Sequence, residues 1–326
     1  MSAGLPRVAR VHPPVGLSTL FRPLPKQARP VLNVEYRLPD GLVLRFSARQ
    51  ALGVPEQTLL LVLLEMAGEQ FASVGVEAVV QADDTRPVPQ RLWTGLYPHG
   101  TSEHQSVMMD TTWEELNRRC GTDNGGSAIR MRKQCLRRLC EVVVWEEQQR
   151  RRVTQQSFLV SWLIGDDRRV HLALNHRLAA VFVGGQYARV SLAERMQLRS
   201  DLAKHIHAFF STSIRHGHQL YIGMETLAAR VWPRDHDSAP DGTLRRRRTE
   251  LRRALDAIGR LSGWNVTRDD EHGLTTVYRK GSPGVREMPS GGSSSPPTAQ
   301  GERSTPDKSL SGQHLSQYDV SGLFNT

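Results

Sequence analysis

The residues with the clearest potential for metal chemistry are His205 and His207, which flank Ile206. Enzymes that nick DNA hold a metal ion on such a His-hydrophobe-His triplet when it lies on a strand beside a tyrosine nucleophile. Here the surrounding residues have helical periodicity, because Leu202, Ile206 and Phe209 recur on one face. Residues two apart on a helix point about 200° away from each other, so both imidazoles cannot bind one ion. We therefore expect no metal site, and place both histidines on the surface or flank of a helix.

Other catalytic arrangements are missing from the sequence. The cysteines Cys120, Cys135 and Cys140 form no CxxC pair and have no zinc-binding spacing, so we interpret them as reduced cytoplasmic thiols. No GxxxxGK[ST] loop is present that would hold nucleotide phosphates. The acidic stretches 166–167 and 269–271 fall in expected turns, where such residues are typical of solvated loops. We expect no enzyme activity, no catalytic residue, no metal, no cofactor and no small-molecule substrate.

The charge balance points to an acidic partner. The chain has 326 residues, and 43 Lys+Arg against 33 Asp+Glu give a net charge of +10. Clustered cations indicate a polyanion, for which nucleic acid is the usual choice and an anionic membrane surface the alternative. No run of about 18 apolar residues exists to span a bilayer. The first 16 residues lack the apolar stretch of a signal peptide, so we expect a cytoplasmic protein without membrane contact.

Composition predicts four segments. Residues 1–30 are rich in proline and carry no periodic apolar pattern, so we expect a flexible arm. Residues 281–326 begin with a Ser/Gly/Pro tract that cannot bury enough apolar surface to offset the entropy of ordering, so we expect a disordered tail. Between them, alternating strand and helix patterns predict one domain over 31–184 and a second over 185–280.

Each predicted domain contains a basic helix in the same setting. A strand, a short helix and a polar turn precede the basic helices at 127–142 and 243–261, and a β-hairpin is expected after each. A helix-turn-helix followed by a hairpin is the winged-helix plan. The sequence therefore predicts an α+β fold with two tandem winged-helix domains.

The apolar residues of the two basic helices recur with the same spacing. Apolar residues with spacings of 7, 4 and 3 recur with an offset of 115: Ile129, Leu136, Cys140 and Val143 in one helix, and Leu244, Leu251, Leu255 and Ile258 in the other. At 3.6 residues per turn each set forms one stripe, which must face its domain's core.

The opposite faces carry the expected base-reading residues, since Arg recognises guanine and Gln recognises adenine in the major groove by paired hydrogen bonds. They are Arg130, Gln134 and Arg138 in the first helix, and Arg245, Arg246, Thr249 and Arg253 in the second. Cations nearer the core edge or in the hairpin turns are expected phosphate contacts. These are Arg132, Lys133, Arg151, Arg152, Arg168, Arg247, Arg248 and Arg252.

A family resemblance accompanies these patterns. The segments that carry it are HLALN (171–175), GGQYARVSLAE (184–194), TLAARVWP (226–233), TLRRRRTELRRAL (243–255) and GWNVT (263–267). Together they resemble the RepC replication initiators of IncQ-type broad-host-range plasmids. The resemblance extends to LFRPL (20–24), the hairpin at 32–46 and MAG (66–68), and covers roughly 17–280. The chain departs from the family pattern at 75–105, in the longer turn before 243 and in the tail beyond 280.

The resemblance implies a bacterial cytoplasmic initiator with two winged-helix domains that bind directly repeated origin sequences, the iterons. It further implies melting of an adjacent AT-rich region and recruitment of a replicative helicase. A transcriptional repressor with tandem winged helices is an alternative that the sequence barely separates from an initiator. A metal-dependent nickase using His205 and His207 is a weaker alternative. Related initiators also suggest a homodimer, which nothing in these residues tests.

Overall fold

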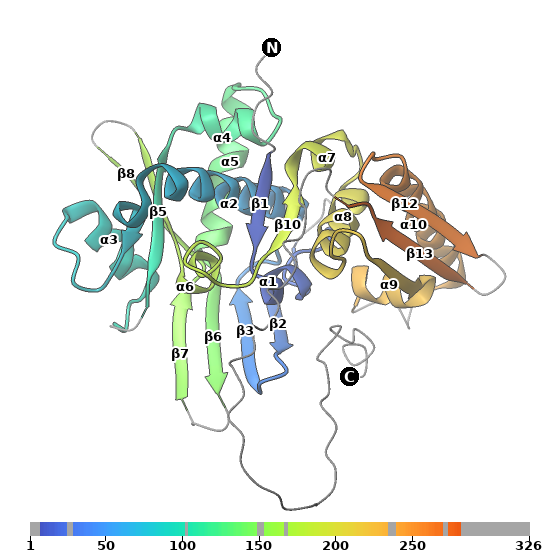
Figure 1. Cartoon of the computed structure of the whole chain (residues 1–326), viewed down its shortest axis with the longest axis horizontal. Helices are drawn as coiled ribbons and strands as arrows, with labels where there is room; N and C mark the ends of the chain where they lie inside the picture. The colour runs from blue at the N-terminus through green and yellow to red at the C-terminus, as the bar shows by residue number, and fades with distance from the viewer. Residues whose placement is uncertain are drawn as a thin grey trace, which may run out of the picture. The chain divides into compact units, whose positions relative to one another are not determined.

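A computed structural model of the chain describes residues 7–24, 29–101, 104–148, 153–165, 169–233, 239–269 and 273–281. Residues 7–281 are described below as one unit. Within the described part, helices combine with small antiparallel sheets, which agrees with the expected mixture of helix and strand (Figure 1).

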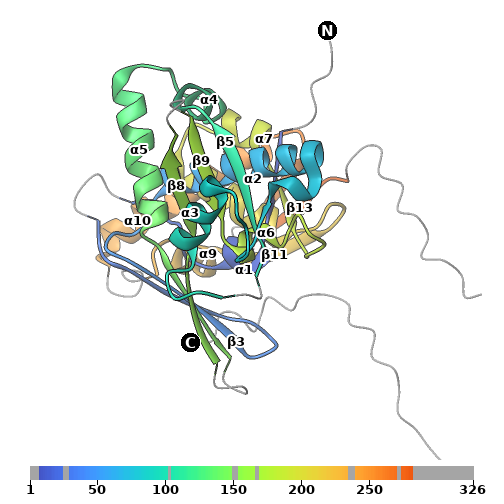
Figure 2. The same cartoon turned by 90° about the vertical axis from the view of Figure 1, so that its left-hand side faces the viewer.

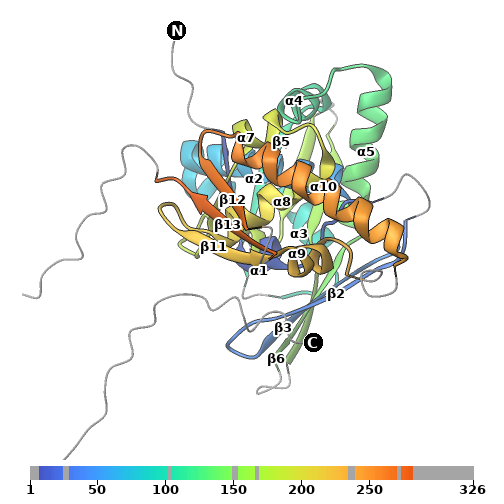
Figure 3. The same ribbon diagram turned by 90° about the vertical axis from the view of Figure 1, so that its right-hand side faces the viewer.

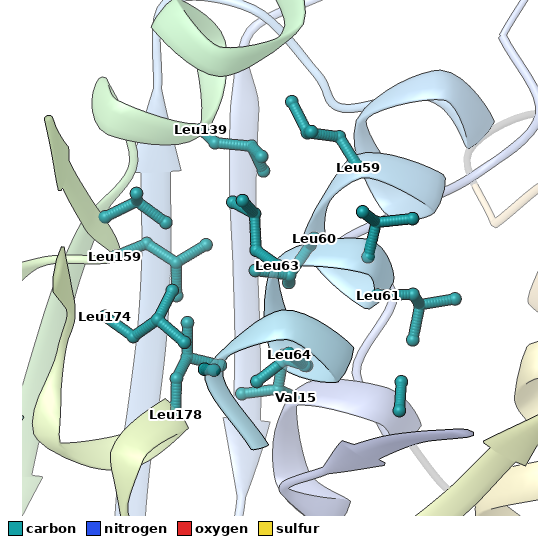
Figure 4. Packing of buried hydrophobic residues seen from close by; sticks show 14 of the residues in the cluster. Val15, Leu59, Leu60, Leu61, Leu63, Leu64, Leu139, Leu159, Leu174 and Leu178 are labelled. Carbon is teal, nitrogen blue, oxygen red and sulfur yellow. The ribbon is translucent and has the colours of Figure 1, made fainter. Parts of the chain in front are cut away.

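The long helix α2, Val54–Val74, lies in the larger core. Pro55 sits in its first turn, where a missing N–H costs nothing, and Glu56 accepts a hydrogen bond from the Gly53 N–H at 2.8 Å. The helix continues past Gly68 and ends at Gly75, whose φ of 58° suits a helix terminus. Figure 4 shows its leucines among those of neighbouring elements. The labelled residues are Val15, Leu59, Leu60, Leu61, Leu63, Leu64, Leu139, Leu159, Leu174 and Leu178.

The length and composition of Val54–Ala78 would suffice to cross a membrane. Thirteen residues of α2 are buried within the protein, however, as in the core helix of a soluble fold. Its buried carboxylates are also paired, since Glu65 accepts hydrogen bonds from Arg7 at 2.9 Å and Glu56 from Arg29 at 3.0 Å. A core helix accounts for these pairs better than a lipid-exposed one, because charges in lipid are costly.

One four-stranded sheet has the order β4-β5-β9-β8 and packs near α2 and α3. Its strands are β4 (Val79–Val80), β5 (Ser106–Thr111), β8 (Val160–Ile164) and β9 (Val170–Leu174). The helices around it are α3 (Pro87–Leu96), α4 (Trp113–Arg119), α5 (Gly126–Cys140) and α6 (His176–Ala179), and the 3-10 turn η1 spans Gly75–Ala78. Thr112 caps α4, because its hydroxyl accepts a hydrogen bond from the Glu115 N–H at 3.2 Å.

A second four-stranded sheet has the order β2-β3-β6-β7 and extends away from α2 (Figure 1). Its strands are β2 (Leu32–Arg37), β3 (Leu42–Ala48), β6 (Val143–Gln148) and β7 (Val153–Phe158). The β2–β3 hairpin is confirmed, and Gly41 adopts the φ of 83° that its turn requires. The hairpin β6–β7, which directly follows α5, pairs with β3 rather than with β5. The hairpin β8–β9, in contrast, pairs with β5, the strand that precedes α4.

The C-terminal part of the unit has its own core. Its elements are α8 (Asp201–Ser213), β11 (Gln219–Gly223), α9 (Met224–Val231), α10 (Asp241–Gly259), β12 (Trp264–Asp269) and β13 (Leu274–Arg279). The three strands form a sheet of order β11-β13-β12. Figure 3 shows α10 along this part, where it packs against α8, α9 and β12.

The order of elements is repeated along the chain. The series α2, β5, α4, α5, β8, β9 runs parallel to α8, β11, α9, α10, β12, β13. In both series the last strand lies between the other two, as β5-β9-β8 and β11-β13-β12. The first series differs by the insertion of β6–β7 after α5, and η1, β4 and α3 before β5. The domain boundaries predicted at residues 31, 185 and 281 stay predictions.

The segment expected as a flexible N-terminal arm contains regular structure. Strand β1, Val8–Val11, pairs antiparallel with β10, Ala188–Ser191, and α1, Pro13–Leu17, packs against α8. Ala9 and Val11 are buried, so apolar contacts made far along the chain outweigh the local proline content. Ser191 caps the short helix α7, Leu192–Gln197, and Ser200 caps the separate helix α8.

Candidate nucleic-acid interface

Helix α10 presents the base-reading residues that were expected of it. Leu251, Leu255 and Ile258 are fully buried, which fixes the rotation of the helix. The opposite side is exposed and carries Arg245, Arg246, Thr249 and Arg253. The side chain of Arg246 is 71% exposed and lies 3.8 Å from Glu250, a surface contact that adds little stability.

The expected phosphate contacts on α10 differ in their exposure. Arg248 donates to Glu225 of α9 at 2.9 Å and remains half-exposed. Arg247 is only partly exposed and lies over the Trp232 ring, 5.0 Å from its centroid. Arg252 is exposed at the edge of the face. Arg248 and Arg252 are thus accessible to a phosphate, while the ring contact of Arg247 competes with that role.

Helix α5 presents a smaller exposed face than expected. It packs against α2, α4 and β8 (Figure 2). Arg130 and Gln134 are exposed, as predicted, and Arg137 is exposed as well. Arg137 was not predicted because the apolar stripe was expected to include Cys140 and Val143, whereas Cys135 and Leu139 are buried beside Leu136.

Arg138 is not available to contact a base. Its Nη1 donates to Oε1 of buried Glu56 at 2.9 Å, and its Nε donates to Gln50 at 2.9 Å. Burial opposes ionisation of Glu56, but hydrogen bonds from Arg29, Gly53 and Arg138 hold its pKa below the ordinary value. Arg138 therefore anchors the end of α5 to the start of α2, and its assignment to base reading was wrong.

Arg132 is not a phosphate contact. It is 2% exposed and donates from Nε to Asn117 at 3.3 Å and from Nη2 to Thr122 at 3.2 Å. Both partners belong to α4 or the turn after it, so Arg132 joins the two helices from within. Its burial excludes the predicted contact, because a phosphate cannot reach the guanidinium in this arrangement.

Of the remaining predicted phosphate contacts, the structure describes only Lys133. Lys133 lies over the Trp113 ring, 5.2 Å from its centroid, and is half-buried. Arg151, Arg152 and Arg168 fall outside the residues that the structure describes.

Helices α5 and α10 align with an offset of 119 residues, so the expected offset of 115 was wrong. Four of the five buried positions of α5 match a buried position of α10: Arg132 with Leu251, Cys135 with Ala254, Leu136 with Leu255, and Leu139 with Ile258. The fifth, Ala128, matches the partly buried Arg247. The helix ends agree, because the Glu141 N–H bonds the Arg137 carbonyl and the Arg260 N–H bonds the Asp256 carbonyl. An offset of 115 would instead match buried Cys135 with Glu250, which is 46% exposed.

The histidine triplet lies on helix α8, as the periodicity predicts. His205 is 5% exposed and His207 is fully buried, so placing them on the surface was wrong. His207 Nε2 lies 3.1 Å from Oε2 of Glu194, which also accepts from the Trp264 indole N–H at 3.0 Å. Among the described residues, no cluster of three His, Cys, Asp or Glu side chains has the spacing of a metal site.

Comparison with known proteins locates the chain in one family. No curated protein sequence matches it. Two crystal structures of domains 2 and 3 of RctB are similar. One has a TM-score of 0.49 at 10% identity and covers 83% of this chain and 98% of the other. The second has a TM-score of 0.47 at 9% identity and covers 82% and 96%. The sequence model of Replication protein C (RepC) matches residues 8–275, and the chain therefore belongs to the RepC family of replication initiators.

Proposed function

We propose that this protein binds double-stranded DNA at a plasmid replication origin and recognises repeated sequences there through α10 and α5. The observation that carries the proposal is the exposed face of α10, where Arg245, Arg246, Thr249 and Arg253 lie opposite a fully buried stripe. A B-DNA major groove admits one α-helix, and arginine can bind guanine through two hydrogen bonds. Membership of the RepC family supports replication initiation as the purpose of the binding.

The arrangement around α10 supports a winged-helix reading. Helix α8, strand β11, helices α9 and α10, and the hairpin β12–β13 follow in the order of that motif, with β13 between the other strands. The series from α2 to β9 supports a second unit of the same type, into which β6–β7 is inserted. In this reading α10 and α5 are the recognition helices, and the turns of β12–β13 and β8–β9 are the wings.

The binding proposal is tested with the full chain and a random library of DNA duplexes. After several rounds of selection at about 150 mM salt, we expect one enriched motif, bound at least 10³-fold more tightly than unrelated duplex. Footprinting on a cognate origin should then show protection of repeated copies of that motif. A chain that binds every duplex with the same affinity at this salt concentration contradicts the proposal.

Origin melting and helicase recruitment complete the proposed role. They rest on the family resemblance and on no contact within the described residues. A permanganate footprint of a supercoiled origin plasmid tests melting directly, since unpaired thymines react. We expect reactive thymines beside the repeats when the protein is added. Unchanged reactivity at saturating protein would remove melting from the proposal and leave the DNA-binding part standing.

We further propose that the chain has no catalytic residue of its own. His205 and His207 are buried on α8, and His207 lies against Glu194 and Trp264 rather than in an open site. A supercoiled plasmid incubated with the protein and Mg²⁺ or Mn²⁺ is expected to stay supercoiled. Nicked product that disappears in a His207→Gln variant of unchanged fold would restore the nickase alternative.

A further inference from the structure

Helices α5 and α10 can be compared residue by residue because their alignment is fixed at both the core and the ends. Beyond the matched buried positions, the hydrogen bond from Val142 N–H to the Leu139 carbonyl has its equivalent between Leu261 and Ile258. All three kinds of evidence, from burial, helix ends and the following turn, give the same offset of 119.

The exposed residues follow the same alignment. The described side chains exposed on α5 are Ser127, Arg130, Met131, Gln134 and Arg137, and each matches an exposed residue of α10. Their counterparts, in the same order, are Arg246, Thr249, Glu250, Arg253 and Asp256. Arg138 instead matches Ala257, and both positions are half-buried, which explains why Arg138 turns inward to Glu56.

We infer that Gln134 and Arg253 occupy the same reading position in two equivalent recognition helices. The inference rests on the proposed DNA binding and assigns a different base to each of the two helices. A glutamine amide at that position fits adenine, with an acceptor for N6 and a donor for N7, whereas an arginine fits guanine O6 and N7. The binding site then contains two half-motifs that agree in geometry but differ at this base pair, with adenine facing α5 and guanine facing α10.

The inference also predicts the spacing between the base pairs that each helix contacts. Arg130 lies four residues before Gln134, and Thr249 lies four residues before Arg253. One turn of helix rises about 5.4 Å, so each pair reaches base pairs separated by the same short step. The step between the base pairs affected by Arg130 and Gln134 must therefore equal the step between those affected by Thr249 and Arg253, in length and direction.

Exchange variants of the full chain test the assignment. Duplex selection is performed on the wild type, Gln134→Arg, Arg253→Gln and the double exchange. We expect Gln134→Arg to change one A·T pair to G·C in one half-motif, and Arg253→Gln to make the reverse change in the other. Each change in preference should be about 5- to 150-fold. Both residues are exposed, so melting temperatures should match the wild type.

Further variants check the alignment itself. Arg130→Ala and Thr249→Ala should each relax discrimination at one base pair. The distance from that base pair to the one changed by Gln134→Arg or Arg253→Gln, respectively, should be the same in both half-motifs. Arg138→Gln is the matched control, because the offset of 115 would make it the counterpart of Arg253, and it should leave the selected motif unchanged. The inference is overturned if the exchange variants select the same motif as the wild type, or if the base-pair step of one half-motif differs from that of the other. A wild type that selects no motif would instead contradict the proposed function itself.

Discussion

The Nη1 atom of Arg138, near the end of α5, donates a 2.9 Å hydrogen bond to Oε1 of Glu56, a carboxylate of α2 that is fully buried. The contact fixes a helix with an exposed reading face to the longest core helix of the protein. Arg29 binds the other oxygen of Glu56 at 3.0 Å, so the carboxylate is shared between two cations. The position of α5 thus depends on a charge that water does not reach.

Replacing Arg138 should reduce stability and leave sequence preference intact. Arg138→Met keeps the bulk of the side chain but removes two hydrogen bonds, one of them to a buried charge, and should lower the free energy of unfolding by about 2 kcal/mol. Urea unfolding measures this loss. Arg137→Met, in the exposed neighbouring position, is the control and should change stability by less than about 0.5 kcal/mol. Equal effects of the two substitutions would contradict the anchoring role of Arg138.

Arg253 should behave in the opposite way. Because its side chain is exposed on α10, Arg253→Ala should leave the free energy of unfolding within about 0.5 kcal/mol of the wild type. Affinity for the selected duplex should fall by about 1–3 kcal/mol, and discrimination should relax at one base pair. A titration of labelled duplexes, each with one substituted base pair, measures both effects. A uniform loss across all duplexes would indicate a phosphate contact instead.

Arg252 should contribute affinity without specificity. It is exposed beside the reading face, where a phosphate contact is expected. Arg252→Gln should weaken binding to every duplex alike and should reduce the slope of log affinity against log salt concentration by about 0.9. Binding isotherms between about 50 and 200 mM salt provide the slope. An unchanged slope would show that this side chain does not neutralise a phosphate.

The buried His205 should make stability depend on pH. Burial, followed by the nearby charges of Arg230 and Arg195, lowers the pKa of His205 from 6.5 to about 3. The imidazole therefore takes up a proton more readily in the unfolded chain, and stability is lost as the pH falls from about 6.5 towards 3. His205→Leu should lose less stability than the wild type over that range, which urea unfolding at several pH values would reveal. Parallel curves would contradict a buried neutral His205.

The sequence predicted several elements because local signals and tertiary packing agree there. The hairpin β2–β3 has its turn residues, and α4 has Thr112 as its cap. Helix α10 was predicted together with its exposed face, since Leu251, Leu255 and Ile258 form a clear stripe. Where local residues alone decide the structure, sequence patterns suffice.

The predictions failed where contacts between residues distant in the sequence determine the structure. A hairpin was expected after the basic helix at 127–142, but the pairing of β6 with the distant strand β3 is not encoded in its own residues. The phase of α5 was misjudged because Arg132 occupies a core position that Leu251 occupies in α10. An arginine at such a position looks like a surface residue in sequence, and only its partners Asn117 and Thr122 show otherwise.

The pairing of β1 with β10 has a consequence for biosynthesis. The partners of residues 8–11, at 188–191, are synthesised about 180 residues later. Arg230, which donates to the Leu17 carbonyl, follows later still. Contacts between such distant parts of a chain form slowly, because a long loop must close first. Strand β1 therefore waits unpaired while the residues up to β10 are being translated, a period in which chaperone contact and aggregation compete with folding.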